Sequence, residues 1–291
     1  MYLKKIKQTK PVLWKYLPIV FFFLLLIVVN FVVTLVVGPT EYKVDENNRL
    51  PFFIGNVAFL SGFCFVVMLW VKYAQKIPLT TFITSRKKIS IKRLALSFFI
   101  WAGIIILLIT IDYYLNPSEY IWNFNLETFI PFLIAAILLI PLQASFEEFL
   151  IRGQLFQYLA IKSNKKWVAI IITSIVFGLM HGLNPEVDKL GWLIMVFYIG
   201  TGIFLSVMTI MDQGLELALG FHISNNLITA LLVTTDWTVF QTDSILISTG
   251  EPQIGMTILL PVFVLYPLLL WFFSRVYKWK PWKELLLGSI D

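Results

Sequence analysis

Residues 17–38 read LPIVFFFLLLIVVNFVVTLVVG, an apolar stretch long enough for a helix to cross the hydrocarbon core of a bilayer. Residues 94–111 form a second stretch of this kind. The whole chain of 291 residues is 58% hydrophobic and 14% charged, whereas soluble domains are about 45–50% apolar and about 25% charged. The short alternating segments of transmembrane strands are missing. The sequence therefore predicts an all-α, polytopic transmembrane helix bundle and excludes a soluble enzyme, a secreted disulfide scaffold and a disordered chain.

Breakers and polar runs divide the chain into about eight apolar segments. We expect spans at residues 17–38, 52–74, 94–115, 129–151, 167–183, 190–211, 214–233 and 255–274. No internal repeat or soluble domain separates them, so we expect residues 1–291 to form a single integral membrane domain. The chain has one cysteine, Cys64, which excludes an intramolecular disulfide and is expected to be a core residue.

Lysine and arginine gather in alternate loops, whereas the other loops carry mostly aspartate and glutamate. The positive-inside rule then predicts a cell-membrane protein with both termini, residues 75–93 and residues 162–166 in the cytoplasm. This sorting explains the net charge of +6, so no nucleic-acid partner is expected. Residues 86–93 are also suited to bind anionic lipid, although we prefer the topological role. The basic amino terminus resembles a signal peptide, but the apolar run is too long and we expect a retained span.

Ionisable side chains at membrane depth cost roughly 2.5–3.5 kcal/mol each at a helix centre and therefore indicate function. Three clusters lie at or near the expected fourth, fifth and seventh spans. The first is Glu147, Glu148 and Arg152, the second is Phe177 and His181, and the third is His222 and Asn226. Glu148 and Arg152 are four residues apart and can pair on a helix, while Glu147 points about 100° away.

The depth of these residues links the clusters. A turn is expected near Asn164, with Glu147 lying 17 residues before it and His181 lying 17 residues after it. In an antiparallel helical hairpin, equal distances from the turn place a carboxylate and an imidazole at the same depth. His222 lies about nine residues beyond the turn expected at residues 212–214, roughly 13 Å deep at 1.5 Å per residue, whereas Glu147 and His181 lie about 25 Å from their own turn. The two depths agree if the fourth and fifth helices extend roughly 10 Å into the cytoplasm. Gln154, Gln157 and the polar stretch that follows favour water and support this extension. We therefore expect a site that is open to the cytoplasm or to the inner leaflet.

This combination suits peptide hydrolysis, which needs an activated water, a stabiliser for the oxyanion and a proton donor for the leaving amine. Glu147 can take a proton from a water that His181 also holds. His222 and Asn226 share one helix face and can supply oxyanion donors. The pair of Glu148 and Arg152 would orient the helix. No serine or cysteine nucleophile motif and no His-Glu-x-x-His zinc site stands out.

The three clusters resemble the motifs Glu-Glu-x-x-x-Arg, Phe-x-x-x-His and His-x-x-x-Asn of the CPBP (or Abi) intramembrane proteases, the type II CAAX prenyl endopeptidase and bacteriocin-processing family. All three are complete and in order, so residues 129–233 are similar to that family's catalytic core. The resemblance implies a bundle of about eight helices with an intramembrane active site. It also implies a metal-free glutamic endopeptidase in which Glu147 and His181 activate water. His222 and Asn226 would form the oxyanion hole, with Glu148, Arg152 and Phe177 in support.

The implied substrates are hydrophobic or lipidated membrane peptides or proteins, in CAAX-type proteolysis, peptide or pheromone maturation, or bacteriocin self-immunity. Three alternatives stay open. Glu147, His181 and His222 could instead be zinc ligands, because two histidines and a carboxylate can form an open three-ligand site. The same buried groups could relay protons or bind an ion in a transporter. A catalytically idle scaffold is the third, and the complete motifs argue against it. The sequence does not determine the substrate or the oligomeric state.

Overall fold

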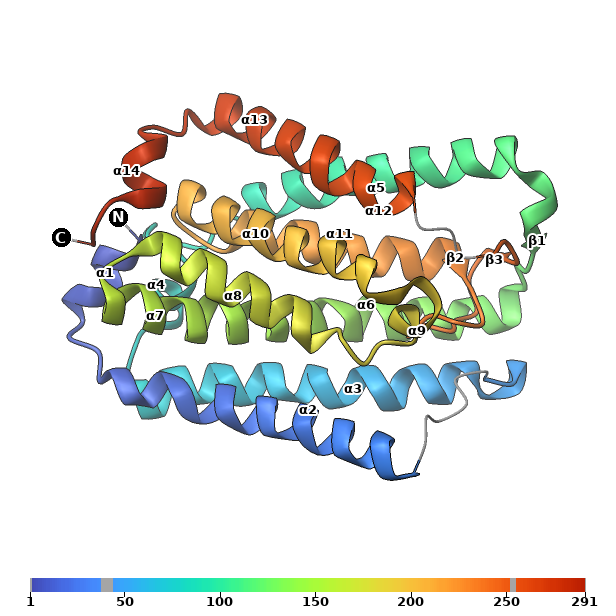
Figure 1. Ribbon diagram of the computed structural model, residues 1–291, viewed down its shortest axis with the longest axis horizontal. Coiled ribbons are helices and arrows are strands. Elements are labelled where there is room, and N and C mark those ends of the chain that lie inside the picture. The colour runs from blue at the N-terminus through green and yellow to red at the C-terminus, as the bar shows by residue number, and fades with distance from the viewer. Residues whose placement is uncertain (1, 38–43, 252–254, 291) are drawn as a thin grey trace.

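The computed structural model describes residues 2–37, 44–251 and 255–290 of a helical bundle, shown in Figure 1. The long helices are α2 (Leu17–Val37), α3 (Arg49–Leu69), α5 (Ile91–Leu115), α6 (Leu126–Glu148), α8 (Lys166–Met180), α10 (Ile194–Asp212), α11 (Glu216–Leu232) and α13 (Tyr266–Tyr277). The shorter helices are α1 (Tyr2–Gln8), α4 (Leu79–Ile83), α7 (Phe156–Ser163), α9 (Pro185–Leu190), α12 (Met256–Leu260) and α14 (Trp282–Leu287). Three π-helical segments extend α3, α6 and α12: η3 (Trp70–Gln75), η5 (Phe149–Leu155) and η7 (Pro261–Leu265).

Each of the eight predicted segments is largely helical in the part that the structure describes. Six stretches are long and apolar enough to cross a membrane: Leu13–Thr34, Glu46–Gln75, Ile91–Leu115, Leu126–Ser163, Pro185–Asp212 and Ile258–Tyr277. The predicted fifth and seventh spans, α8 and α11, have only 15 and 17 residues. At 1.5 Å per residue these two helices are about 22 and 26 Å long, less than the roughly 30 Å hydrocarbon core. The all-α polytopic bundle is confirmed, and it is an integral membrane protein.

The two short helices pack against longer neighbours, and α11 is the more deeply buried of the two. Helix α11 packs against α5 and α6, and α8 packs against α10. Helices α2 and α3 run along one long side, and α13 runs along the opposite side (Figure 1). The outward side chains of α2 are apolar; Phe21, for example, is 61% exposed. Such side chains suit contact with lipid, whereas the helices at the centre carry the polar groups.

The two ends of the bundle differ. Both chain termini lie at one end, beside α1 and α14, and a small sheet lies at the other (Figure 1). Its strand order is β1-β3-β2, with β1 (Tyr120–Trp122) antiparallel and β2 (Val233–Thr234) parallel to β3 (Leu246–Ser248). The turn predicted near Asn164 is present, because Asn164 has a left-handed backbone (φ 54°) between α7 and α8.

One expectation about this region is wrong. Gln154 and Gln157 were expected in water, but both side chains are fully buried. Gln75 donates a hydrogen bond to Gln154 (Nε2 to Oε1, 2.6 Å). Gln157 donates to the hydroxyl of Tyr2 (2.5 Å) and to the carbonyl of Phe82 (3.0 Å). Helices α1 and α4 and the segment η3 thus cover this end of the bundle, and their hydrogen bonds offset part of the cost of burying the two amides.

Candidate active site

The end of α6 carries the first cluster. Glu147 and Glu148 are its last two residues, and the chain continues into the π-helical segment η5, which contains Arg152. The guanidinium Nη1 of Arg152 lies 2.9 Å from Oε1 of Glu148, and both side chains are completely buried. The predicted ion pair is therefore present. π-Helical turns inserted into α-helices are frequent at functional sites, and this one shifts the register directly after the two glutamates.

Arg152 and Glu148 connect three helices. Arg152 also donates to the backbone carbonyl of Gly202 in α10 (3.2 Å) and lies 4.4 Å from the ring centroid of Phe177 in α8. Oε1 of Glu148 receives a second hydrogen bond, from Nδ1 of His222 in α11 (2.8 Å). A carboxylate only accepts, so the hydrogen is on Nδ1 of the imidazole. The buried pair thus orients the ring of His222, a role that the sequence did not predict.

Glu147 faces both histidines. Its Oε1 accepts a hydrogen bond from Nε2 of Gln143, one turn earlier in α6. Its Oε2 lies 4.0 Å from Nε2 of His181 and 3.6 Å from Nε2 of His222. Within the described part of the chain no donor hydrogen-bonds to this buried oxygen. The structure therefore brings the predicted base and the two imidazoles together, at the depth expected from the turn at Asn164.

The two imidazoles present the same nitrogen to the carboxylate. Nδ1 of His181 lies 2.7 Å from the carbonyl oxygen of Phe177, which can only accept, so this nitrogen also carries a hydrogen. In a neutral ring the Nε2 atom is then an acceptor. An acceptor nitrogen on His181 and the free oxygen of Glu147 converge on one small space. Such a pair favours a species that can donate two hydrogen bonds, and water is one.

Asn226 joins the site through Gln143. Its Nδ2 donates to Oε1 of Gln143 (3.1 Å), and the Nε2 of the same glutamine donates to Glu147. An amide group has two N–H donors, so one of those on Asn226 stays available. The neighbouring Asn225 donates to Oδ1 of Asn226 (3.2 Å) and accepts from Trp101 (3.1 Å), which holds the asparagine amide in one orientation.

The comparisons with known proteins address the same region. Residues 127–228 match the family model described as type II CAAX prenyl endopeptidase, Rce1-like. The resemblance to this family is confirmed. The matched region contains all seven residues of the three motifs and covers α6, η5, α7, α8, α9, α10 and most of α11, so the Rce1-like region is the part of the fold that builds the site.

A curated protein is similar over a longer stretch. The chain is 30% identical over 175 residues to the Bacillus subtilis (strain 168) protein YyaK, whose printed name calls it uncharacterized. The similarity covers 60% of this chain and 58% of YyaK. No solved structure matches the chain.

Two residues of the candidate site were not predicted from the sequence. Gln143 lies four residues before Glu147, and this spacing on one helix face was a signal for it. Tyr198 in α10 stacks on the ring of His181, with centroids 4.5 Å apart, and accepts a hydrogen bond from Asn184 (3.4 Å). Nothing in the spacing of Tyr198 distinguishes it from the other aromatic residues, so only the packing of α10 on α8 shows its place.

The zinc alternative concerns Glu147, His181 and His222. Among the residues that the structure describes, no three His, Cys, Asp or Glu side chains are grouped so that they could hold a metal ion. Nδ1 of each histidine is bonded to an oxygen, which leaves one nitrogen on each ring for any ligand. The atoms left for such a ligand are Nε2 of each ring and Oε2 of Glu147.

Proposed function

We propose that this protein is an intramembrane glutamic endopeptidase that hydrolyses peptide bonds in hydrophobic, membrane-associated peptides or proteins. The observation that carries the proposal is the free oxygen of Glu147, buried in the bundle and facing the Nε2 atoms of His181 and His222. The match to the Rce1-like CAAX endopeptidases supports a protease over a transporter with the same buried groups.

In the proposed reaction, water donates one hydrogen bond to Glu147 and the other to Nε2 of His181. Glu147 takes the proton while the water oxygen attacks the carbonyl carbon, and the carbonyl oxygen becomes the oxyanion. The proton then passes from Glu147 to the leaving amine as the C–N bond breaks. One carboxylate thus serves as base and then as acid, and the reaction balances without another reagent.

The oxyanion would receive hydrogen bonds from His222 and Asn226. Glu148 accepts the Nδ1 hydrogen of His222. An imidazolium beside this carboxylate presents its Nε2–H to the site, and the free amide hydrogen of Asn226 supplies a second donor. The buried pair of Glu148 and Arg152 would therefore have two roles: it holds the end of α6 in place and it orients the ring of His222.

The membrane orientation belongs to the same proposal. The charge sorting of the loops favours a cell-membrane protein with both termini in the cytoplasm, and both termini lie at one end of the bundle (Figure 1). The site would then take a hydrophobic segment or peptide tail from the cytoplasm or from the inner leaflet. CAAX-type processing, peptide maturation and bacteriocin self-immunity are the roles consistent with such a substrate.

The test compares membrane peptides from cells that carry the wild-type protein with those from cells that carry Glu147→Gln. Glu127→Gln is the matched control, because it is the same substitution at an exposed position of the same helix. We expect an uncleaved precursor to accumulate with Glu147→Gln and not with the control. Identical peptide patterns in all three strains, with the three proteins equally abundant, would contradict the proposal.

A further inference from the structure

A cavity of about 360 Å³ lies away from the proposed catalytic site, at the end of the bundle where both termini lie. It opens between the ends of α10 and α13, helix α14, the first turn of α5 and the segment that precedes α5. Six of its lining residues matter here: Arg86, Arg93, Asp212, Tyr277, Lys278 and Lys280. Four of them are cationic and one is anionic.

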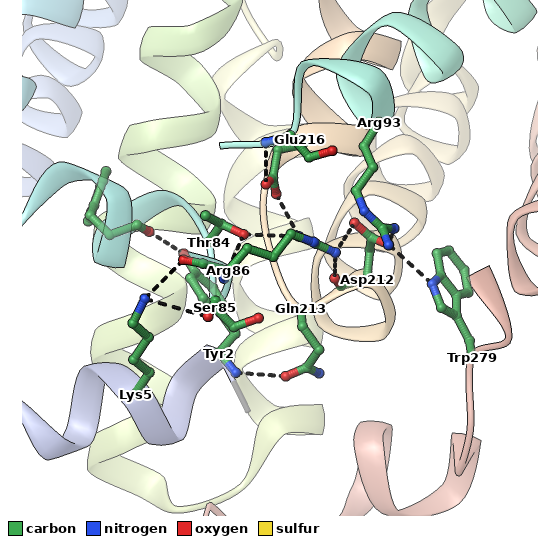
Figure 2. Close-up of polar contacts among 12 residues, drawn as sticks. Tyr2, Lys5, Thr84, Ser85, Arg86, Arg93, Asp212, Gln213, Glu216 and Trp279 are labelled. Carbon is green, nitrogen blue, oxygen red and sulfur yellow. Dashed lines mark hydrogen bonds and ion pairs between the residues drawn. The ribbon is translucent and has the colours of Figure 1, made fainter. Parts of the chain in front are cut away.

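Two buried carboxylates hold the two arginines in place, as Figure 2 shows. Arg86 donates to Oδ2 of Asp212 (2.9 Å) and to Oε2 of Glu216 (3.0 Å). Arg93 pairs with the other oxygen of Asp212, which also accepts from the indole of Trp279 (3.3 Å). Asp212 is 3% exposed and Glu216 is completely buried. This network fixes the guanidinium groups at the wall of the cavity and neutralises them.

The two lysines then leave a surplus of positive charge. Four cations meet two carboxylates, so two positive charges are uncompensated. Lys278 and Lys280 are exposed, and no described residue pairs with either side chain. Arg93 lies 3.7 Å from the ring centroid of Tyr277 and hydrogen-bonds to the described residues through only one of its terminal nitrogens. Its other N–H groups are free to bind an anion.

We propose that this cavity binds the phosphate of an anionic phospholipid headgroup. Guanidinium groups bind phosphate oxygens with fixed geometry, and lysines near a bilayer surface attract anionic lipid. The cavity lies at the end of the span Ile258–Tyr277, where a headgroup would be, and Trp279 with Tyr277 supplies the aromatic groups that suit this level of a membrane. The inference does not depend on the proposed catalysis.

The experiment uses the purified full chain in neutral detergent micelles and measures the midpoint of thermal unfolding as lipid is added. Phosphatidylglycerol and phosphatidylcholine with identical acyl chains are compared. Glycerol 1-phosphate is added in a separate experiment as a water-soluble compound that carries a phosphate group without acyl chains. The variant is Lys278→Ala/Lys280→Ala. The matched control is Lys162→Ala/Lys165→Ala, which removes the same charge from exposed lysines outside the cavity.

We expect phosphatidylglycerol to raise the unfolding midpoint of the wild type and of the control. The cavity variant should need about thirty-fold more lipid for the same shift, since each lysine near an anionic surface is worth about fivefold in affinity. Equal shifts from both lipids, or equal losses in the control and the cavity variant, would overturn the proposal. A shift from glycerol 1-phosphate without one from phosphatidylglycerol would assign the cavity to a soluble phosphate instead.

Discussion

The sharpest prediction concerns Glu148, which shares one oxygen between two buried partners. Its Oε1 accepts from Nη1 of Arg152 (2.9 Å) and from Nδ1 of His222 (2.8 Å), and Glu148 and Arg152 have no exposed surface. Replacing Glu148 by alanine would leave the guanidinium buried with only the carbonyl of Gly202 as a hydrogen-bond acceptor. Removing one partner of a buried ion pair costs about 3–5 kcal/mol, so we expect a loss of this size in the free energy of unfolding.

Glu147→Gln should behave in the opposite way. The glutamine keeps an oxygen that accepts from Gln143, so the free energy of unfolding should change by about 1 kcal/mol or less. Peptide hydrolysis should fall at least by the factor of about 10²–10⁴ that a general base contributes. Of the two neighbouring glutamates, Glu148 is thus expected to be mainly structural and Glu147 to be catalytic.

The assay is unfolding of the purified protein in mixed micelles with increasing dodecyl sulfate, followed by circular dichroism, beside a peptide-cleavage assay. Glu127→Gln is the exposed control. The double variant Glu148→Gln/Arg152→Met should recover much of the lost stability, because it removes both charges together. The reasoning is refuted if Glu148→Ala unfolds like the wild type, or if Glu147 proves dispensable for cleavage while Glu148 does not.

Further predictions follow from the packing and the topology. Gln143→Leu should lower the cleavage rate by about tenfold or more with a smaller effect on substrate affinity, because Glu147 loses its hydrogen bond; Gln143→Glu should not restore the rate. Gly202→Ala should destabilise the fold by about 1–3 kcal/mol, because a methyl group there would meet backbone atoms of α8 at 2.8–3.0 Å, whereas Gly103→Ala, with nothing within 4 Å, should not. Excess chelator should leave the purified protein active and free of stoichiometric zinc; activity lost to chelator and restored by zinc would give the histidines a metal-binding role. A membrane-impermeant thiol reagent should label cysteine at Asn47 from outside intact cells and not cysteine at Lys87, and the reverse pattern would invert the topology.

The parts of this protein that the sequence determined depend on short-range spacing. Apolar blocks of about 20 residues identified the spans, since the thickness of a bilayer sets the length of a helix. The spacing of four residues predicted the pair of Glu148 and Arg152, and it is present at 2.9 Å. The equal distances of Glu147 and His181 from Asn164 predicted that they meet, because a helix rises by a constant amount per residue.

Only the tertiary structure decided which helix faces meet. His222 bonds to Glu148 across 74 residues of sequence, and Asn226 bonds to Gln143 across 83. Gln157 is polar and was expected in water, yet a hydrogen bond to Tyr2, 155 residues away, accompanies its burial. The periodicity of apolar residues in the sequence defines the faces of a helix, but it does not define which other helix packs against each face. The close fit of α11 against α5 and α6, and of α1 over the end of the bundle, determines where these polar groups find donors and acceptors.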